Sequence, residues 1–355
     1  MPMHHYTELP LHGGNAPRWL FSRMVKLGSA IGTVILDEFG ADELVARLSD
    51  SAWLQALACT MGYDWHSSGT TTVTMGALKE ALNDTGEIFI AGGKGKAGLK
   101  TPQDITTGVD VLSIPGADDE FKELSRLSAK IDSALVYDNV GIYHHTFVFS
   151  KNRKWSVVQQ ALDSKNRKAI RFQWNGGNVD KKDIANEPHS AVYSDMRKIS
   201  LDLTNHENDW ARSGSIEALR EFPYYSKDSP LTDYPSRHAI IPRLDISKRG
   251  LDAIKRASER DPQSYKELLL VKGIGRSTLR SLAFVSSVIY GKELSYKDPV
   301  TYSYNVGGKD GIPFPVDTKT YDSAISAMEH MIDGAKLESK EKYAALRRLS
   351  SAFST

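Results

Sequence analysis

Apolar residues recur at helical spacing through the first sixty positions of the chain. Trp19, Leu20, Met24, Leu27 and Ile31 predict a helix over 17–36, with Pro17 near its first turn. Leu44, Leu48, Leu54 and Leu57 form the apolar stripe of a second predicted helix over 41–59. The start of the protein is therefore predicted to be helical.

The pattern becomes mixed after residue 60. Residues 60–76 are rich in turn-forming residues, a helix is expected at about 76–83, and Ile88-Phe89-Ile90 is expected to be a short strand. A glycine-rich run, 92–98, follows that strand, and the next helix is predicted over 119–133.

Three runs in the middle of the chain are rich in β-branched and aromatic residues. They cover 142–149, 155–160 and 170–174, and the turn between the first two is basic. Short runs of this composition, separated by turn residues, are typical of an antiparallel meander. We therefore expect a sheet in this part of the protein.

Residues 205–240 are polar and contain prolines, which indicates a long connection, and from 247 onward the pattern is mainly helical. The predicted fold class is α+β. It comprises an N-terminal mixed domain with an antiparallel sheet over 1–205, a connecting segment over 206–246, and a C-terminal helical domain over 247–355 that carries a helix-hairpin-helix element.

Composition excludes some classes of protein but does not point to one function. The chain has 355 residues, 45 of them basic and 44 acidic, so its net charge is only +1 and any surface for nucleic acid must be a local patch. A lone cysteine, Cys59, forms no internal disulfide. We find no run that spans a bilayer and no secretory signal, so a cytoplasmic protein is expected.

One local pattern carries a clear physical mechanism. Asp261-Pro262 is a good helix start, and the run Val271-Lys272-Gly273-Ile274-Gly275 separates that helix from a second apolar-periodic segment. Two glycines let the backbone turn sharply, and the amides at the start of the second helix then receive a phosphate. The turn therefore predicts a grip on a DNA backbone.

The run 270–279 resembles the helix-hairpin-helix signature of DNA repair proteins. That resemblance implies contact with backbone phosphates without sequence readout. The expected DNA-binding residues are Lys272, Gly273, Ile274, Gly275, Arg276, Ser277, Thr278 and Arg280.

Two further segments resemble known families. Phe314-Pro315-Val316-Asp317-Thr318 is similar to the segment that bears the essential aspartate of the helix-hairpin-helix DNA glycosylases, which implies Asp317 as the catalytic carboxylate. Most of the chain resembles the family catalogued as domain of unknown function 763, for which we know no established activity. The residues that carry this resemblance are 8–14, 16–20, 64–69, 158–160 and 307–317.

Other polar residues leave an alternative open. Asp64 and His66 lie two positions apart, and they would bind Mg²⁺, Mn²⁺ or Zn²⁺ if His144 and His145 converged on them. A bound metal would support phosphodiester hydrolysis. Lys94 and Lys96, in the glycine-rich run, are expected to touch a nucleic-acid backbone, although a plain surface turn explains them equally well.

The leading hypothesis is a repair-type enzyme, a hydrolase acting on DNA, that excises bases as glycosylases do. A metal-dependent nuclease and a non-enzymatic DNA-binding protein remain as alternatives. DNA is the expected partner, no membrane is implicated, and the oligomeric state stays open. No cofactor is required unless the nuclease alternative holds, in which case a divalent metal is bound.

Overall fold

The alternating residues of the middle segment form a five-stranded antiparallel sheet with strand order β1-β2-β3-β4-β5. The computed structural model describes residues 16–63, 68–137, 140–163, 168–194, 200–225, 248–300, 329, 332–334 and 339–353. The strands are β1 (Ile88–Lys94), β2 (Val140–Ser150), β3 (Trp155–Asp163), β4 (Lys168–Asn175) and β5 (His189–Tyr193). The predicted α+β class and meander are confirmed.

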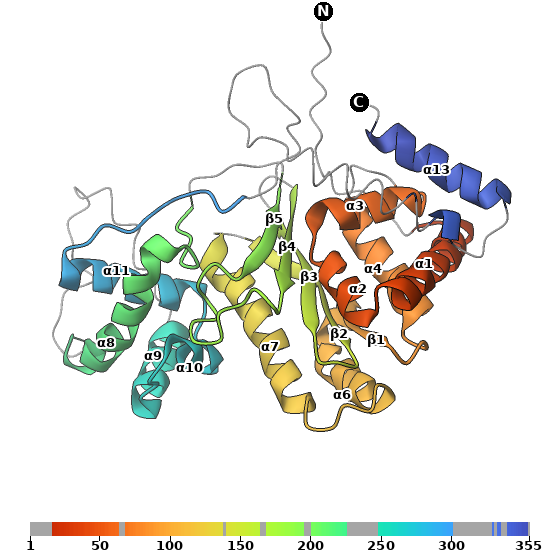
Figure 1. Ribbon diagram of the computed structural model, residues 1–355. Helices are drawn as coiled ribbons and strands as arrows, with labels where there is room; N and C mark the ends of the chain where they lie inside the picture. Colours follow the sequence, from red (N-terminus) through yellow and green to blue (C-terminus); the bar gives the residue numbers. More distant parts are fainter. Residues whose placement is uncertain are drawn as a thin grey trace, which may run out of the picture.

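Four helices cover one face of this sheet (Figure 1). They are α1 (Arg18–Glu38), α2 (Ala41–Leu48), α3 (Ser51–Thr60) and α4 (Gly69–Leu82). Met24, Ile31 and Ile35 of α1 are buried in one cluster with Leu78 and Val148. Among the described residues, α1 is the one helix that is long and apolar enough to cross a bilayer by composition.

The opposite face is covered by α6 (Thr101–Val111) and α7 (Asp118–Ile131), which follow the short α5 (Lys96–Leu99). The ring of Phe121 on α7 lies 5.5 Å from that of Phe147 and 4.9 Å from that of Phe149. A single π-helical turn, η1 (Asp132–Val136), follows α7. Such turns are rare and are often found at functional sites.

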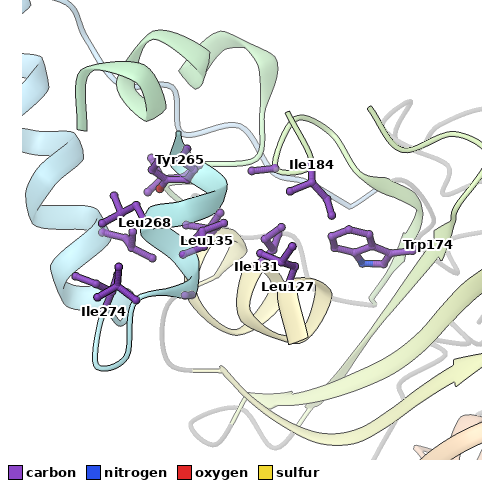
Figure 2. Packing of buried hydrophobic residues seen from close by; sticks show 14 of the residues in the cluster. Leu127, Ile131, Leu135, Trp174, Ile184, Tyr265, Leu268 and Ile274 are labelled. Atoms are coloured by element: carbon purple, nitrogen blue, oxygen red, sulfur yellow. The ribbon is translucent and has the colours of Figure 1, made fainter. Parts of the chain in front are cut away.

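A further layer of helices lies beyond α7. It contains η2 (His206–Asn208), α8 (Asp209–Tyr225), α9 (Lys248–Arg260), α10 (Tyr265–Leu270) and α11 (Arg276–Tyr290). Leu268 and Ile274 share one apolar cluster with Leu135 and Trp174, so the core is continuous from the sheet to this layer (Figure 2). A last helix, α13, covers Ser339–Phe353.

Several elements differ from the sequence-based expectation. The helix expected over 41–59 is divided into α2 and α3, and Asp50 caps α3 by accepting from the amide of Trp53. Helix α4 begins at Gly69 and includes the threonines that the sequence placed in a turn. Strand β5 was not expected, and α8 occupies residues that were assigned to a connection.

Candidate nucleic-acid interface

A tight turn over residues 271–275 joins α10 to α11. Gly273 has a φ of +92°, a value that L side chains rarely adopt, and it is exposed. Ile274 is only 1% exposed and lies in the same cluster as Leu268 and Leu135 (Figure 2). Val271 is 5% exposed and lies in the same cluster, so the turn is anchored by two apolar side chains and presents Gly273 to solvent.

The first turn of α11 follows directly after this anchor. Gly275 is the residue before the helix, and no side chain caps it. The first intrahelical bond is donated by the amide of Leu279 to the carbonyl of Gly275. The amides that precede Leu279 in the helix have no acceptor within it, and the helix dipole adds positive potential there. This arrangement suits an anion such as a phosphate.

Two cations stand beside the turn. Lys272 is exposed within it, and Arg256 of α9 donates from Nη2 to the carbonyl of Lys272 at 3.5 Å. Sequence reasoning missed Arg256, although the exposed surface of α9 carries more basic than acidic residues, the acidic ones being Asp252 and Glu259. The exposed basic residues of that helix are Arg249, Lys255, Arg256 and Arg260. The turn thus lies at the edge of a local basic surface.

Two predicted phosphate contacts point inward instead. Arg276 donates from Nε to the carbonyl of Ser133 at 3.1 Å and from Nη2 to the carbonyl of Val140 at 2.5 Å. Arg280 donates from Nη2 to the carbonyl of Leu201 at 2.9 Å. The side chains of Ile274 and Thr278 are both buried. Ile274 and Thr278 can therefore meet a ligand only through their backbone, and the half-buried Arg276 and Arg280 are already bonded to carbonyls. Lys272 and Ser277 have exposed side chains.

Helix α7 holds the turn from the other side. Arg126 donates to the carbonyl of Leu270 at 2.9 Å, and Lys130 donates to the carbonyl of Ile274. Burial, and then the neighbouring Arg126, lowers the pKa of Lys130. Cations near the carbonyl end of α10 complement its dipole. The turn is thereby fixed in place, which lowers the entropic cost of presenting its amides to a ligand.

The glycine-rich run lies at the end of β1. A Cβ on Gly92 would lie 2.3 Å from the carbonyl oxygen of His145, so a glycine is needed where β1 approaches β2. Asp104 accepts from the amide of Gly92 at 2.9 Å and fixes this end of the strand. Lys94 and Lys96 follow and are exposed. Gly92 is therefore explained by close packing of β1 against β2, whereas Lys94 and Lys96 are free to meet a ligand in solvent.

The two adjacent histidines of β2 lie on opposite faces of the sheet. His145 faces α7, where its Nε2 is 2.8 Å from Ser125 Oγ and its Nδ1 is 2.8 Å from Gln159 Oε1. His144 faces α4. Asp64 and His66 lie outside the described residues, and no group of three His, Cys, Asp or Glu that could hold a metal occurs within them. A site built on Asp64 and His66 would use one of these histidines, not both.

The α7 side contains a continuous buried network. Gln159 donates from Nε2 to Asp132 and to the carbonyl of Ser128. Asp132 also accepts from Trp174 Nε1 at 3.0 Å and lies 2.6 Å from His189 Nε2. Burial lowers the pKa of His145, and the hydrogen bond to Gln159 opposes that effect. Every polar group named here has a partner, as buried networks require.

On the α4 side the corresponding pair is incomplete. His144 and Gln160 are directly opposite each other on β2 and β3, and both are buried. Within the part of the chain that the structure describes, both ring nitrogens of His144 and the Oε1 of Gln160 lack hydrogen-bond partners. Burial, followed by the charges of His145 and Lys94, lowers the pKa of His144 to about 3. His144 is therefore a neutral imidazole in the folded protein.

Asp317, the residue expected to be catalytic, lies outside the described residues. The described chain reaches Val300, which is 3% exposed and shares an apolar cluster with Val140. Val140 is also the residue whose carbonyl accepts from Arg276. The chain that leads to Asp317 thus leaves the described core beside the point where α11 meets β2.

One of three comparisons with known proteins gave a match. The model of a family described as a protein of unknown function, DUF763, matches residues 5–316. No curated protein and no solved structure matches the chain.

Proposed function

The chain belongs to the DUF763 family, and we propose that it binds the phosphate backbone of DNA through the 271–275 turn and acts on that DNA as a repair-type enzyme. The observation that carries the proposal is the geometry of the turn. An exposed Gly273 with positive φ, a buried Ile274 and an uncapped helix start present backbone amides outward. Phosphate is one of the anions that such a helix start binds.

Charge around the turn supports the same ligand. Lys272 and Arg256 are exposed, and α9 adds further basic residues at the surface. The net charge of the whole chain is only +1, so this basic surface is local and has a specific place in the fold. Contacts of this type neutralise phosphates and release counterions without reading bases.

The enzymatic part of the proposal rests on Asp317. A carboxylate near bound DNA would stabilise the cationic sugar that forms when a base is excised. Val300 leads into the segment that contains Asp317, and it is buried next to Val140, where α11 is anchored. Asp317 itself lies outside the described residues, so its role is tested by substitution.

The binding claim is tested by measuring DNA affinity against salt concentration with a labelled undamaged duplex. The double variant Lys272→Ala/Arg256→Ala removes two cations, so the slope of log affinity against log salt should fall by about 1.8. The matched control is Arg23→Ala/Lys26→Ala, which removes two exposed cations from α1 on the far side of the sheet. Equal slopes in the two variants would reject the turn as the binding site.

Activity is tested on a panel of duplexes that carry damaged bases, with and without EDTA. A glycosylase forms abasic sites in EDTA, and Asp317→Asn should abolish them. Cleavage of undamaged DNA that requires added metal would show the nuclease alternative instead. Binding without either reaction would show a DNA-binding protein that is not an enzyme.

A further inference from the structure

A row of polar side chains crosses all five strands on the face covered by α4. Directly paired positions bring together Lys94 of β1, His144 of β2, Gln160 of β3, Arg171 of β4 and Tyr193 of β5. The same face also carries buried apolar residues such as Val148 and Val158, and the neighbouring row adds the buried polar residues Thr146 and Gln173. Polar residues in a buried row are costly unless each is hydrogen-bonded.

The distal part of the row is paired within the protein. Arg171 donates to Ser51 Oγ at 2.9 Å and to Gln55 Oε1 at 3.2 Å, and its guanidinium lies 4.5 Å from the ring of Tyr193. The part nearer β1 is different. His144 is 1% exposed and Gln160 is fully buried, yet three of their polar atoms have no hydrogen-bond partner among the described residues.

The other face of the same strands provides an internal comparison. His145 and Gln159 are also a histidine and a glutamine, each one position away from His144 and Gln160 on the same strand. Their hydrogen bonds are satisfied by each other and by Ser125 and Asp132. The protein thus satisfies one His–Gln pair with its own side chains. For the second pair, His144 and Gln160, the completing groups are absent from the described residues.

The orientation of Gln160 is fixed. Its Nε2 donates to the carbonyl of Ser68 at 3.0 Å and to the hydroxyl of Tyr143 at 2.6 Å, so Oε1 is the side-chain atom left to accept from a ligand. Tyr143 reaches this face because it is the extra residue of a β-bulge between Ile142 and His144. Bulges often re-aim side chains beside functional sites.

Charge decides which ligand fits. Lys94, exposed beside His144, and the uncapped start of α4 at Ser68 both disfavour a cation and favour an anion. The ligand must also accept from the N–H of the neutral imidazole, and it must donate to Gln160 Oε1. A phosphate monoester carrying one P–OH meets all three needs, whereas a phosphodiester or sulfate has no proton to donate.

We propose that His144, Gln160 and Lys94 form a binding site for a phosphate monoester. The imidazole N–H donates to a phosphate oxygen, Gln160 Oε1 accepts from the P–OH, and Lys94 balances the charge. The ligand is either a small phosphorylated compound or the phosphorylated end of a nucleic-acid strand. The second source rests on the proposed DNA binding, while the site itself does not.

The test uses the full-length protein and inorganic phosphate as the probe. The ring nitrogens of His144, followed by nitrogen NMR, should shift saturably with phosphate, and those of His145 should not, because they are already bonded to Ser125 and Gln159. Sulfate is the control anion and should cause no saturable shift. If phosphate leaves His144 unmoved, or sulfate moves it equally, the site holds water or counterions and the proposal is wrong.

Two variants separate binding from folding. Lys94→Ala changes an exposed residue and should weaken phosphate affinity about tenfold without altering the urea midpoint. Gln160→Glu keeps the size of the side chain but places a carboxylate beside the phosphate, so it should abolish the shift. Lys151→Ala, another exposed lysine, is the matched control and should leave affinity unchanged. Equal affinities in the Lys94 and Lys151 variants would overturn the proposal.

The two ligand sources are distinguished with oligonucleotides. A strand with a terminal phosphate that competes with inorganic phosphate at His144, when its hydroxyl-terminated twin does not, identifies a nucleic-acid end. Competition by nucleoside monophosphates alone identifies a small compound. The Lys272→Ala/Arg256→Ala variant tests the turn separately, because it should lose binding to a hydroxyl-terminated duplex. A negative result for the phosphate site therefore does not decide the proposal for the turn, and the reverse also holds.

Discussion

Arg276 Nε donates a hydrogen bond to the carbonyl oxygen of Ser133 at 3.1 Å. This bond joins the start of α11 to the π-helical turn η1. Arg276 Nη2 also donates to the carbonyl of Val140. Arg276→Ala would leave these partly buried carbonyls without a donor, so we expect it to lower the free energy of unfolding by about 1–3 kcal/mol.

Lys272→Ala is the matched comparison for Arg276→Ala, because it removes the same charge from the same turn. Lys272 is exposed, and we expect its loss to change stability by less than about 0.5 kcal/mol while weakening DNA binding. Urea denaturation and binding anisotropy on both variants give the comparison. Equal destabilisation of the two proteins would contradict the roles assigned here.

The two glycines of the turn should respond differently to alanine. A Cβ on Gly273, at a φ of +92°, would lie 2.8 Å from Arg256 Nη2, whereas a Cβ on Gly275 meets nothing closer than 4.0 Å. Gly273→Ala should therefore cost about 1–3 kcal/mol through backbone strain. Gly275→Ala should keep its stability but bind DNA less tightly, since the methyl group stands beside the amides. Thermal melts measure the stability of both variants, and binding anisotropy measures their affinity for DNA. A stable Gly273→Ala protein together with a destabilised Gly275→Ala protein would contradict the prediction.

Local periodicity was sufficient to predict much of the fold. Helix α1 and strands β2, β3 and β4 follow directly from their apolar patterns because each buries one continuous stripe or run. The five-residue strand β5 was missed because it is too short to carry a clear pattern. The start of α4 was missed because its threonines have low helix propensity and depend on tertiary packing against the sheet.

The candidate site was only partly predictable for a physical reason. Side chains alternate across a strand, so reading β2 as a strand already implies that His144 and His145 face opposite ways. The inward direction of Arg276 follows from docking against Ser133, more than a hundred positions away in the chain, and no local pattern encodes it. The same holds for Arg256, which reaches the turn from α9.

Asp132 should be the most sensitive position of the α7-side network. It is fully buried and accepts from Trp174 Nε1 and Gln159 Nε2, with His189 Nε2 at 2.6 Å. Asp132→Ala removes the acceptor of Trp174 Nε1, the partner of His189 and one of the two acceptors of Gln159 Nε2, and it should cost about 3–5 kcal/mol. Asp132→Asn retains one acceptor oxygen and should cost less. Urea unfolding followed by tryptophan fluorescence measures both, and an alanine variant as stable as the parent would show that the network adds nothing to stability.

The pH dependence of stability gives a separate test of His144. Its pKa falls from 6.5 to about 3 on folding, because burial and the neighbouring charges of His145 and Lys94 disfavour the charged ring. The unfolded chain therefore binds more protons between these pH values. Stability is fully present above about pH 6.5 and is lost as the pH falls toward 3, at up to about 1.4 kcal/mol per pH unit.

His144→Asn removes this titration. We expect the variant to lose less stability than the parent protein between pH 6.5 and pH 4, with the difference at pH 8 serving as the baseline. Urea midpoints across this range measure it. Saturating phosphate should reduce the acid sensitivity of the parent protein, because an anion beside the ring favours its charged form, and it should leave the variant unchanged. Parallel pH profiles in the parent and the variant would show that His144 is not the buried neutral histidine that the structure describes.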